Sequence, residues 1–468
     1  MKKGLLGSTA LISAVAMISG TASAAEAPTW KLTGNANFQF YWVDQDASGT
    51  GAATWDDGDE TWAVGTKVGT SSTGSQKLLW PLGMYETGAA GVQEHDWYFG
   101  VDEAELQLNV SGTADNGLNY GFKIEINANT TDNTVVDEAR LQLSGGWGTL
   151  QMGDEDGAED IMNYGGENLM GATGGFDGDQ DDYLYRAGGG VISASHASWT
   201  STDGTKFFQI ELVGDDASMN LAAPSYASIA GDTSDQTKVS YFSPRFSGFQ
   251  VGASITPTPN NGDNFKEDGD WENHIGLGAN YDNSFGDLRI RASAVYSTRS
   301  NVAQGNGPDG ITDLYEGVSA FSVGGIVGWG PFSLGANYTD NGDSGQPIVQ
   351  DWVAGAYATA PIETSYWNVA AGFETGPMYF SVGYFASTLE FGPFDDSTYE
   401  HLALTADYTV APGLSAYAEI NMISDELLGG GISDVWIEGD PEPIAGPGYS
   451  LSSSNDTTSL VLGMNISF

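Results

Sequence analysis

Hydrophobic and polar residues alternate along most of this chain with the two-residue period of a β-strand. In the segment 30–43 apolar side chains occupy one face of the predicted strand and mainly polar ones the other. Almost no stretch has helical periodicity, and the alternation recurs at 103–110, 118–130, 288–297, 401–410 and 413–424. The sequence therefore predicts an all-β protein whose strands each have one polar and one apolar face.

The connections between these strands differ in length. Tight turns are predicted at 111–117, 144–148, 243–248, 282–287, 328–331, 374–377 and 410–413. Long, acidic, glycine-rich segments are predicted between them at 44–98, 153–182, 214–236, 257–271, 299–317, 340–364, 389–399 and 424–456, with one short exception at 130–134. Short turns at one end and long loops at the other are typical of a transmembrane antiparallel β-barrel.

Aromatic residues and the last ten residues support a barrel in lipid. Many apolar strand faces finish with an aromatic side chain, as interface girdles require: Trp30, Trp42, Tyr281, Tyr296, Trp329, Tyr338, Tyr408 and Phe468. Lipid cannot hydrogen-bond an exposed backbone, so a spanning sheet must close without an edge. We therefore expect Ser459–Phe468 to pair with the strand near Trp30–Val43 and to turn its apolar stripe toward lipid.

The first residues indicate export. Lys2 and Lys3 precede a short apolar run that ends in Ala22-Ser23-Ala24, which is the pattern of a signal peptide cleaved after Ala24. Residues 1–24 are thus interpreted as a signal peptide and 25–468 as the barrel. No later stretch is apolar enough for a spanning helix, and the chain has no cysteine for a disulfide framework.

Charge and residue types exclude several classes of function. The chain has 15 Lys and Arg against 62 Asp and Glu, a net charge of −47, so nucleic acid is excluded as a partner. An aromatic content of 12% argues against disorder, the usual interpretation of so acidic a chain. The four histidines are scattered outside any H-E-x-x-H motif, and carboxylate pairs are too abundant to identify a catalytic one. We therefore predict that the protein is not an enzyme.

Four segments carry a resemblance to a known family: "GGWGTLQMG" (145–153), "KVSYFSPRFSGFQVGASITP" (238–257), "IGLGANYDNSFGDLRI" (275–290) and "SLVLGMNISF" (459–468). In order and spacing they resemble the Gram-negative general porins, more narrowly the alphaproteobacterial trimeric type. The resemblance implies a 16-stranded barrel in the outer membrane, a homotrimer surrounded by lipid and lipopolysaccharide, and passive diffusion of small hydrophilic solutes and ions. It also implies an inward-folded constriction loop, which maps to about 154–182.

Two features depart from this pattern. The segments 191–200 and 205–214 suggest an additional hairpin, so that either the barrel has 18 strands or this hairpin belongs to an enlarged loop; we expect 16 strands. The basic residues that would face the acidic loop are few. By alternation, the inward-pointing candidates for a basic pore wall are Lys31, Lys123, Arg140, Arg289 and Arg291.

The predicted constriction loop is rich in carboxylates. They are Asp154, Glu155, Asp156, Glu159, Asp160, Asp177, Asp179, Asp181 and Asp182. Inside a narrow lumen these groups would favour cations, whereas on the cell surface they would be a solvated acidic loop. Asp177, Asp179 and Asp181 have the opening spacing of an EF-hand, but Asp182 and Gly188 stand where that loop needs Gly and Glu. Looser binding of Ca²⁺ by acidic loops is left open.

The sequence thus predicts an outer-membrane diffusion porin with a preference for cations. One alternative is a channel selective for sugars or organic cations, for which Tyr41 and Tyr417 are the inward aromatic candidates. Two others are a secreted Ca²⁺- or glycan-binding β protein and a surface adhesin built on a barrel.

Overall fold

The computed structural model describes residues 26–50, 95–128, 136–182, 222–257, 271–301, 316–346, 362–391, 396–435 and 444–468, together with residue 184. It also describes short pieces within the loops at 55–56, 61–63, 66–68, 83–84, 191–193, 210–212, 218–220, 349–353 and 356–359. The signal peptide predicted for residues 1–24 lies outside these ranges and stays a prediction.

One large antiparallel sheet forms a closed barrel. It contains 17 strand segments, and β6 and β7 are the two halves of one interrupted strand, so the barrel has 16 strands. The strands are β1 (Glu26–Thr50), β6 (His95–Gly100), β7 (Ala104–Thr113), β8 (Asn119–Asn127), β9 (Val136–Gly145), β10 (Gly148–Asp154), β14 (Thr237–Phe242), β15 (Phe249–Thr256), β16 (Trp271–Phe285), β17 (Leu288–Asn301), β18 (Val318–Trp329), β19 (Phe332–Gly342), β22 (Ile362–Thr375), β23 (Met378–Phe391), β24 (Ser397–Ala411), β25 (Leu414–Val435) and β26 (Ile444–Ser467).

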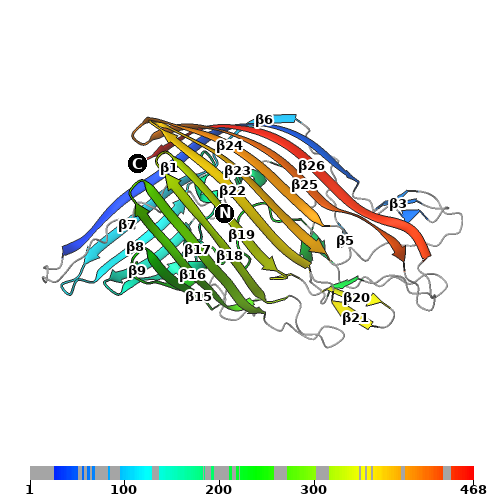
Figure 1. Ribbon diagram of the computed structural model, residues 1–468, viewed down its shortest axis with the longest axis horizontal. Helices are drawn as coiled ribbons and strands as arrows, with labels where there is room; N and C mark the ends of the chain where they lie inside the picture. The colour runs from blue at the N-terminus through cyan, green and yellow to red at the C-terminus, as the bar shows by residue number, and fades with distance from the viewer. Residues whose placement is uncertain are drawn as a thin grey trace.

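The first and last strands close the barrel, as predicted. β1 pairs with β26 in a register that sets Asn35 opposite Ser467 and Trp42 opposite Leu460, and Figure 1 shows the two strands side by side. The amide of Phe468 donates to the carbonyl of Gly34 at 3.0 Å and its carbonyl accepts from the amide of Gly34 at 3.1 Å. The other edge of β1 pairs with β6 and β7, so β1 has a partner on both sides.

The barrel is apolar outside and polar inside. On β26 the side chains of Leu462, Met464 and Ile466 are 43%, 51% and 57% exposed. Their neighbour Ser459 points inward and is buried. A soluble protein rarely exposes a contiguous apolar band of this kind, so the outer surface is a lipid-facing one.

Tight hairpins and long loops lie at opposite ends of the barrel, as predicted. The turns between β16 and β17 and between β22 and β23 have Gly286 and Gly376 at φ 65° and 57°, a conformation that non-glycine residues rarely adopt. The last hairpin is longer than predicted. The segment expected to be a loop from 424 to 456 instead continues as paired strand to Val435 and resumes at Ile444, because backbone pairing extends beyond the apolar belt.

The additional hairpin does not enter the barrel, so the 16-strand expectation is confirmed. β11 pairs with β5 and β13, and β12 pairs with β20, in two small separate sheets. A third small sheet is formed by β2, β3 and β4. Their bounds are β2 Trp55–Asp56, β3 Thr61–Ala63, β4 Thr66–Val68, β5 Gly83–Met84, β11 Val191–Ser193, β12 Ile210–Leu212, β13 Ser218–Asn220, β20 Val349–Val353 and β21 Ala356–Thr359.

Helical structure in the described residues is limited to three short turns after β10. They are α1 (Ala158–Ile161), η2 (Glu167–Leu169) and η3 (Asp179–Asp182). Within the described ranges, no helix is both long and apolar enough to cross a membrane.

Candidate functional site

The chain turns into the barrel directly after β10. Gly153 has φ 140°, and a Cβ built on it would lie 2.2 Å from the carbonyl oxygen of Ala139 on β9. Only glycine fits there without displacing the neighbouring strand. From this bend, residues 155–182 run across the interior; we call them the first lumen segment.

Inward-pointing polar side chains of the wall hold the first lumen segment by its backbone. Ser254 of β15 accepts from the amide of Ala158 at 3.1 Å, and Ser293 of β17 accepts from the amide of Tyr164 at 2.8 Å. Further along, the amide of Gly166 donates to Asn368 of β22 at 2.8 Å and that of Gly171 to Ser381 of β23 at 3.1 Å. The segment therefore follows the inner wall from β15 to β23.

Two carboxylates hold the far end of this segment. Asp407 of β24 accepts from the amide of Ala172 at 3.0 and 3.1 Å. Glu419 of β25 accepts from the amide and the hydroxyl of Thr173 at 3.1 and 2.7 Å. Ala172 has φ 55°, a strained conformation for a non-glycine residue that persists only where the surroundings enforce it. The hydrogen bonds to Asp407 and Glu419 hold Ala172 and Thr173 in this conformation.

Apolar packing also anchors the segment. Leu169 and Phe176 pack against Tyr366, Phe385 and Tyr399 of the wall. A wet lumen lined throughout by polar faces, which strand alternation suggests, is therefore wrong for this part of the barrel. The reason is that a segment seated on the wall must bury apolar surface to offset the entropy lost when it is ordered.

A second lumen segment, residues 222–236, lies beside the first. The hydroxyl of Ser387 on β23 donates to the carbonyl of Pro224, and the amide of Ala230 donates to Asn341 of β19 at 2.9 Å. Gln180 of the first segment donates to the carbonyl of Ser225 at 3.0 Å. The sequence interpretation placed 214–236 among the external loops, which is wrong for 222–236, because wall side chains that alternation alone cannot locate bind it inside.

The acidic residues at the start of the first segment bind the wall. Glu159 is fully buried and accepts from the hydroxyl of Ser254 at 2.9 Å, while its Oε1 lies 3.7 Å from Nε2 of His274. Glu155 is buried and ion-paired with Arg140, and Asp154 accepts from Thr237. The carboxylates of Glu155 and Glu159 thus lie between the segment and the wall, and their role in the selectivity of the constriction stays a prediction.

The remaining predicted acidic residues lie in and beside this segment. Asp156, Asp160 and Asp177 are partly exposed, and Asp179 is buried and donates its amide to Asp177 at 3.3 Å. The side chains of Asp181 and Asp182 are outside the described residues. Binding of Ca²⁺ at Asp177, Asp179 and Asp181 therefore stays a prediction.

The residues predicted to form a basic wall lie in separate places, and Lys123, Arg140 and Arg289 are ion-paired. Lys123 is ion-paired with Glu125 and Glu138, the latter at 2.7 Å. Arg289 binds Asp282 with nitrogen–oxygen distances of 2.6 and 2.9 Å. Arg140 pairs with Glu155, Arg291 lies 5.4 Å from the ring centre of Tyr164, and Lys31 is exposed near the short-turn end of β1. Lys123 and Arg140 lie opposite each other on β8 and β9, and Arg289 and Arg291 are two residues apart on β17. Nearby carboxylates attract Lys123, Arg140 and Arg289, and the five side chains do not form one basic surface.

Carboxylates of Glu138, Glu155 and Asp156 approach one another, with oxygens within 4.8 Å. Lys123 pairs with Glu138 and Arg140 with Glu155. The mutual repulsion of these three carboxylates is thus offset by the positive charges of Lys123 and Arg140 on the same wall.

An interruption between β6 and β7 points two acidic residues inward. The side-chain oxygen of Asn37 on β1 accepts from the backbone amides of Asp102 and Glu103 at 2.8 and 3.0 Å. In a regular sheet a backbone carbonyl of the neighbouring strand would accept such bonds. The side-chain amides of Asn37 and Asn35 donate to Asp102 at 3.1 Å and to Glu103 at 3.2 Å. Successive residues in a regular strand face opposite sides, and an irregularity of this kind re-aims one of them.

Tyr41 and Tyr417, the inward aromatic candidates, do not face the channel. They are 5% and 8% exposed, and they pack with Val461 and against Ala172. Gln39 donates to the hydroxyl of Tyr417 at 2.7 Å. Both rings support the end of the first lumen segment, so they offer little surface to a passing sugar or organic cation.

Burial raises the pKa of carboxyl groups in the first lumen segment. The pKa of Glu159 is raised from 4.5 to about 7 by burial, with a smaller contribution from Asp232, and hydrogen bonding to Ser254 opposes the shift. Burial likewise raises the pKa of Glu155 to about 7, opposed by Arg140. A carboxyl with a raised pKa favours the seated segment most when it is protonated. That contribution is complete below about pH 4.5 and is lost as the pH rises through about 7.

The raised pKa of Glu159 predicts how Glu159→Gln changes thermal stability at different pH values. The variant keeps a neutral side chain at every pH, so it should raise the thermal unfolding midpoint in detergent at pH 8 and leave it nearly unchanged at pH 5, where the native carboxyl is protonated. Glu374→Gln, at the exposed end of β22, is the matched control and should change neither midpoint. An equal gain at both pH values would contradict a raised pKa at Glu159.

Several site residues were missed by the sequence interpretation. Ser254, Asp407 and Glu419 hold the first lumen segment, and Lys238 of β14 contacts both lumen segments. Each occupies an inward position of its alternating strand, and a lysine at such a position beside Val239 and Tyr241 was a usable signal. What they bind could not be read from the strand pattern, because the partners are loop backbone atoms.

The barrel has an apolar exterior, short turns at one end and a segment seated in its lumen. Known proteins share this architecture. The family model for Gram-negative porins matches residues 8–426. The chain belongs to the Gram-negative porin family. This porin is therefore an outer-membrane channel protein, with its short turns at the periplasmic end.

Individual relatives are distant. An uncharacterized protein of Rickettsia typhi is 23% identical over 380 residues, covering 69% of this chain and 82% of that one. An uncharacterized protein of Rickettsia felis is 21% identical over 365 residues, covering 68% and 77%. Among solved structures, the anion-selective porin from Comamonas acidovorans shares 15% identity with a TM-score of 0.51, covering 94% of this chain and 100% of that one. At this identity the likeness shows the fold alone.

Proposed function

We propose that this porin is a cation-preferring diffusion channel for small hydrophilic solutes and ions, without catalytic activity. The observation that carries the cation preference is the distribution of charge inside the barrel. Lys123, Arg140 and Arg289 each bind a carboxylate. At the β6–β7 interruption, Asp102 and Glu105 both act electrostatically on Glu103, so three carboxyl groups lie close together there. The interior therefore keeps an excess of negative charge at the β6–β7 interruption.

The mechanism is sieving by size and by charge. The two lumen segments occupy part of the barrel cross-section and are fastened to β15 through β25, so solutes pass through the space they leave. Asp102 acts electrostatically on Asp177 of the first lumen segment, so negative charges on wall and segment influence the same region. Carboxylates beside a narrow aqueous passage attract cations and repel anions, as acidic rings do in other channels.

We further propose that the protein assembles as a homotrimer, as its family membership suggests. The outer face of β1 and β6 has exposed aromatic side chains, among them Phe38, Trp97 and Phe99, with the rings of Phe38 and Phe99 stacked at 5.5 Å. Such a surface suits either a neighbouring protomer or lipid. Cross-linking in native membranes, followed by denaturing electrophoresis, tests the trimer independently of conductance.

Current through the detergent-purified protein in a planar bilayer tests the channel proposal. We expect ohmic steps in groups of three and a reversal potential, under a KCl gradient, that favours K⁺. Correctly folded protein without conductance would contradict the channel. A reversal potential that favours Cl⁻ would contradict only the cation preference.

A further inference from the structure

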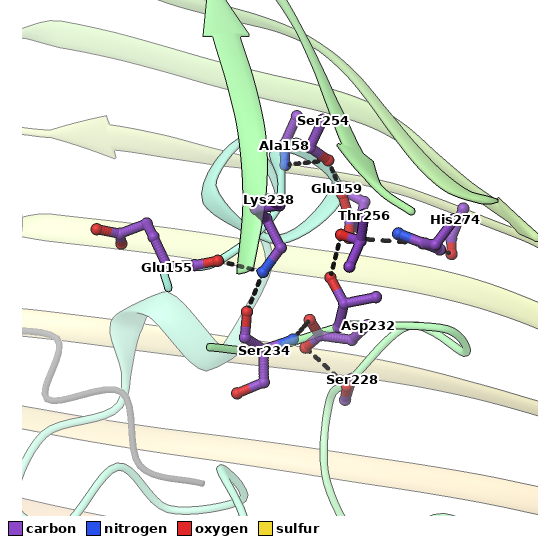
Figure 2. Close-up of polar contacts among 12 residues, drawn as sticks. Glu155, Ala158, Glu159, Ser228, Asp232, Ser234, Lys238, Ser254, Thr256 and His274 are labelled. Atoms are coloured by element: carbon purple, nitrogen blue, oxygen red, sulfur yellow. Dashed lines mark hydrogen bonds and ion pairs between the residues drawn. The ribbon is translucent and has the colours of Figure 1, made fainter. Parts of the chain in front are cut away.

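The start of the first lumen segment and the end of the second meet at one buried lysine. Lys238 of β14 is opposite Gly153, where the chain bends inward, and lies four residues after Ser234, where it returns to the wall. Its side chain is 3% exposed. The amine donates to the carbonyl of Glu155 in the first segment and to that of Ser234 in the second. Figure 2 shows Lys238 between these two acceptors.

The surroundings of Lys238 are strongly acidic. Asp156 and Glu159 of the first lumen segment and Asp232 and Asp235 of the second all interact electrostatically with its amine. Without a cation among them, these carboxylates on two adjacent chain segments would repel one another. The amine therefore acts on both segments twice, through a hydrogen bond to each backbone and through the charge it places among their carboxylates.

Two wall hydroxyls near Lys238 each contact one of the two segments. Ser254 binds Ala158 and Glu159 of the first segment, and Thr256 contacts Thr233 of the second at 3.3 Å. Ser234 has φ 40°, a strained conformation, and its amide donates to Asp232 at 2.9 Å. The amine of Lys238 donates to the carbonyl of Ser234, so this strained residue is held at both its amide and its carbonyl.

We infer that Lys238 is the positioning residue of the constriction, which fastens both lumen segments to each other and to β14 and thereby sets the width and selectivity of the channel. This inference rests on the proposed channel function. The barrel closes through β1 and β26, and β10, β9, β8 and β7 lie between β14 and β1, so loss of the amine should loosen the segments and leave the barrel intact.

The test compares Lys238→Met, which keeps the apolar stem and removes the amine, with wild type in planar bilayers. We expect a higher single-channel conductance, a spread of conductance levels in place of one, and a reversal potential shifted toward zero. Arg245→Met, exposed in the tight turn between β14 and β15, is the matched control and should behave as wild type. Circular dichroism and heat-modifiable migration in detergent should show an intact barrel in both variants.

A removable cross-link separates positioning from a general effect of the substitution. The chain has no cysteine, and the carbonyls of Glu155 and Ser234 bind the same amine. In Lys238→Met carrying Glu155→Cys and Ser234→Cys, oxidation should restore the wild-type conductance and reduction should abolish that restoration. If Lys238→Met alone does not assemble, the oxidised triple variant can be refolded and then reduced in the bilayer.

The outcomes are distinguishable. Wild-type protein that does not conduct would overturn the channel proposal itself. A conducting wild type, with Lys238→Met unchanged in conductance, level distribution and reversal potential, would overturn the role of Lys238 and leave the channel standing. The same conclusion would follow if the cross-linked variant, reduced after assembly, kept wild-type conductance.

Discussion

Leu462→Arg is expected to destabilise the barrel strongly or to prevent its insertion into lipid. Leu462 lies within the outward apolar stripe of β26 and is paired with Phe40 of β1 and Ala418 of β25. An arginine on the lipid face costs ~2–4 kcal/mol at the middle of the bilayer. The substitution also lies in β26, whose pairing with β1 closes the barrel. Equilibrium unfolding by urea in detergent or lipid vesicles measures the loss.

The matched control lies three residues further along the same strand. Asn465 points toward the lumen, is partly exposed and is paired with Asn37. Asn465→Arg introduces the same side chain on the wet face and should reduce stability by much less. Equal losses for the two variants would show that strand position, and not contact with lipid, determines the cost, and would contradict the orientation of β26.

Neutralising the β6–β7 interruption should cause the largest change in selectivity. In the double variant Asp102→Asn and Glu103→Gln, shape is kept and two carboxyl groups are removed from a wall where Lys123, Arg140 and Arg289 are bound to carboxylates. We expect the reversal potential under a KCl gradient to move markedly toward zero, with only a small change in conductance. The wild-type preference should itself weaken with salt, because the screening length falls from about 10 Å at 0.1 M to about 3 Å at 1 M.

A control for net charge is available outside the lumen. Asp115 is exposed in the short turn between β7 and β8. Asp115→Asn should leave the reversal potential nearly unchanged, since a charge in open solvent is screened. If Asp102→Asn with Glu103→Gln behaves like this control, the selectivity filter lies elsewhere, and the first lumen segment is the next candidate.

The sequence by itself determined the fold class, the closure of the barrel and the lipid-facing surface. These features depend on a strict two-residue alternation and on the need to pair every backbone group in lipid, and both can be read from single segments such as 459–468. Loop length likewise identified the periplasmic end. The count of 16 strands was implied by the family resemblance, with 18 as the alternative, and the structure confirmed it by placing β11 and β12 in sheets outside the barrel.

The tertiary structure decided which charges face the lumen and what holds the constriction. Glu159 lies between segment and wall, Tyr41 and Tyr417 support a loop, and residues 222–236 lie inside the barrel. None of this follows from alternation, which shows the side of a strand on which a residue lies but not which distant backbone occupies that side. Lys238 is the clearest case: its inward position is visible in the sequence, whereas its two acceptors come from segments that meet only when the barrel is closed.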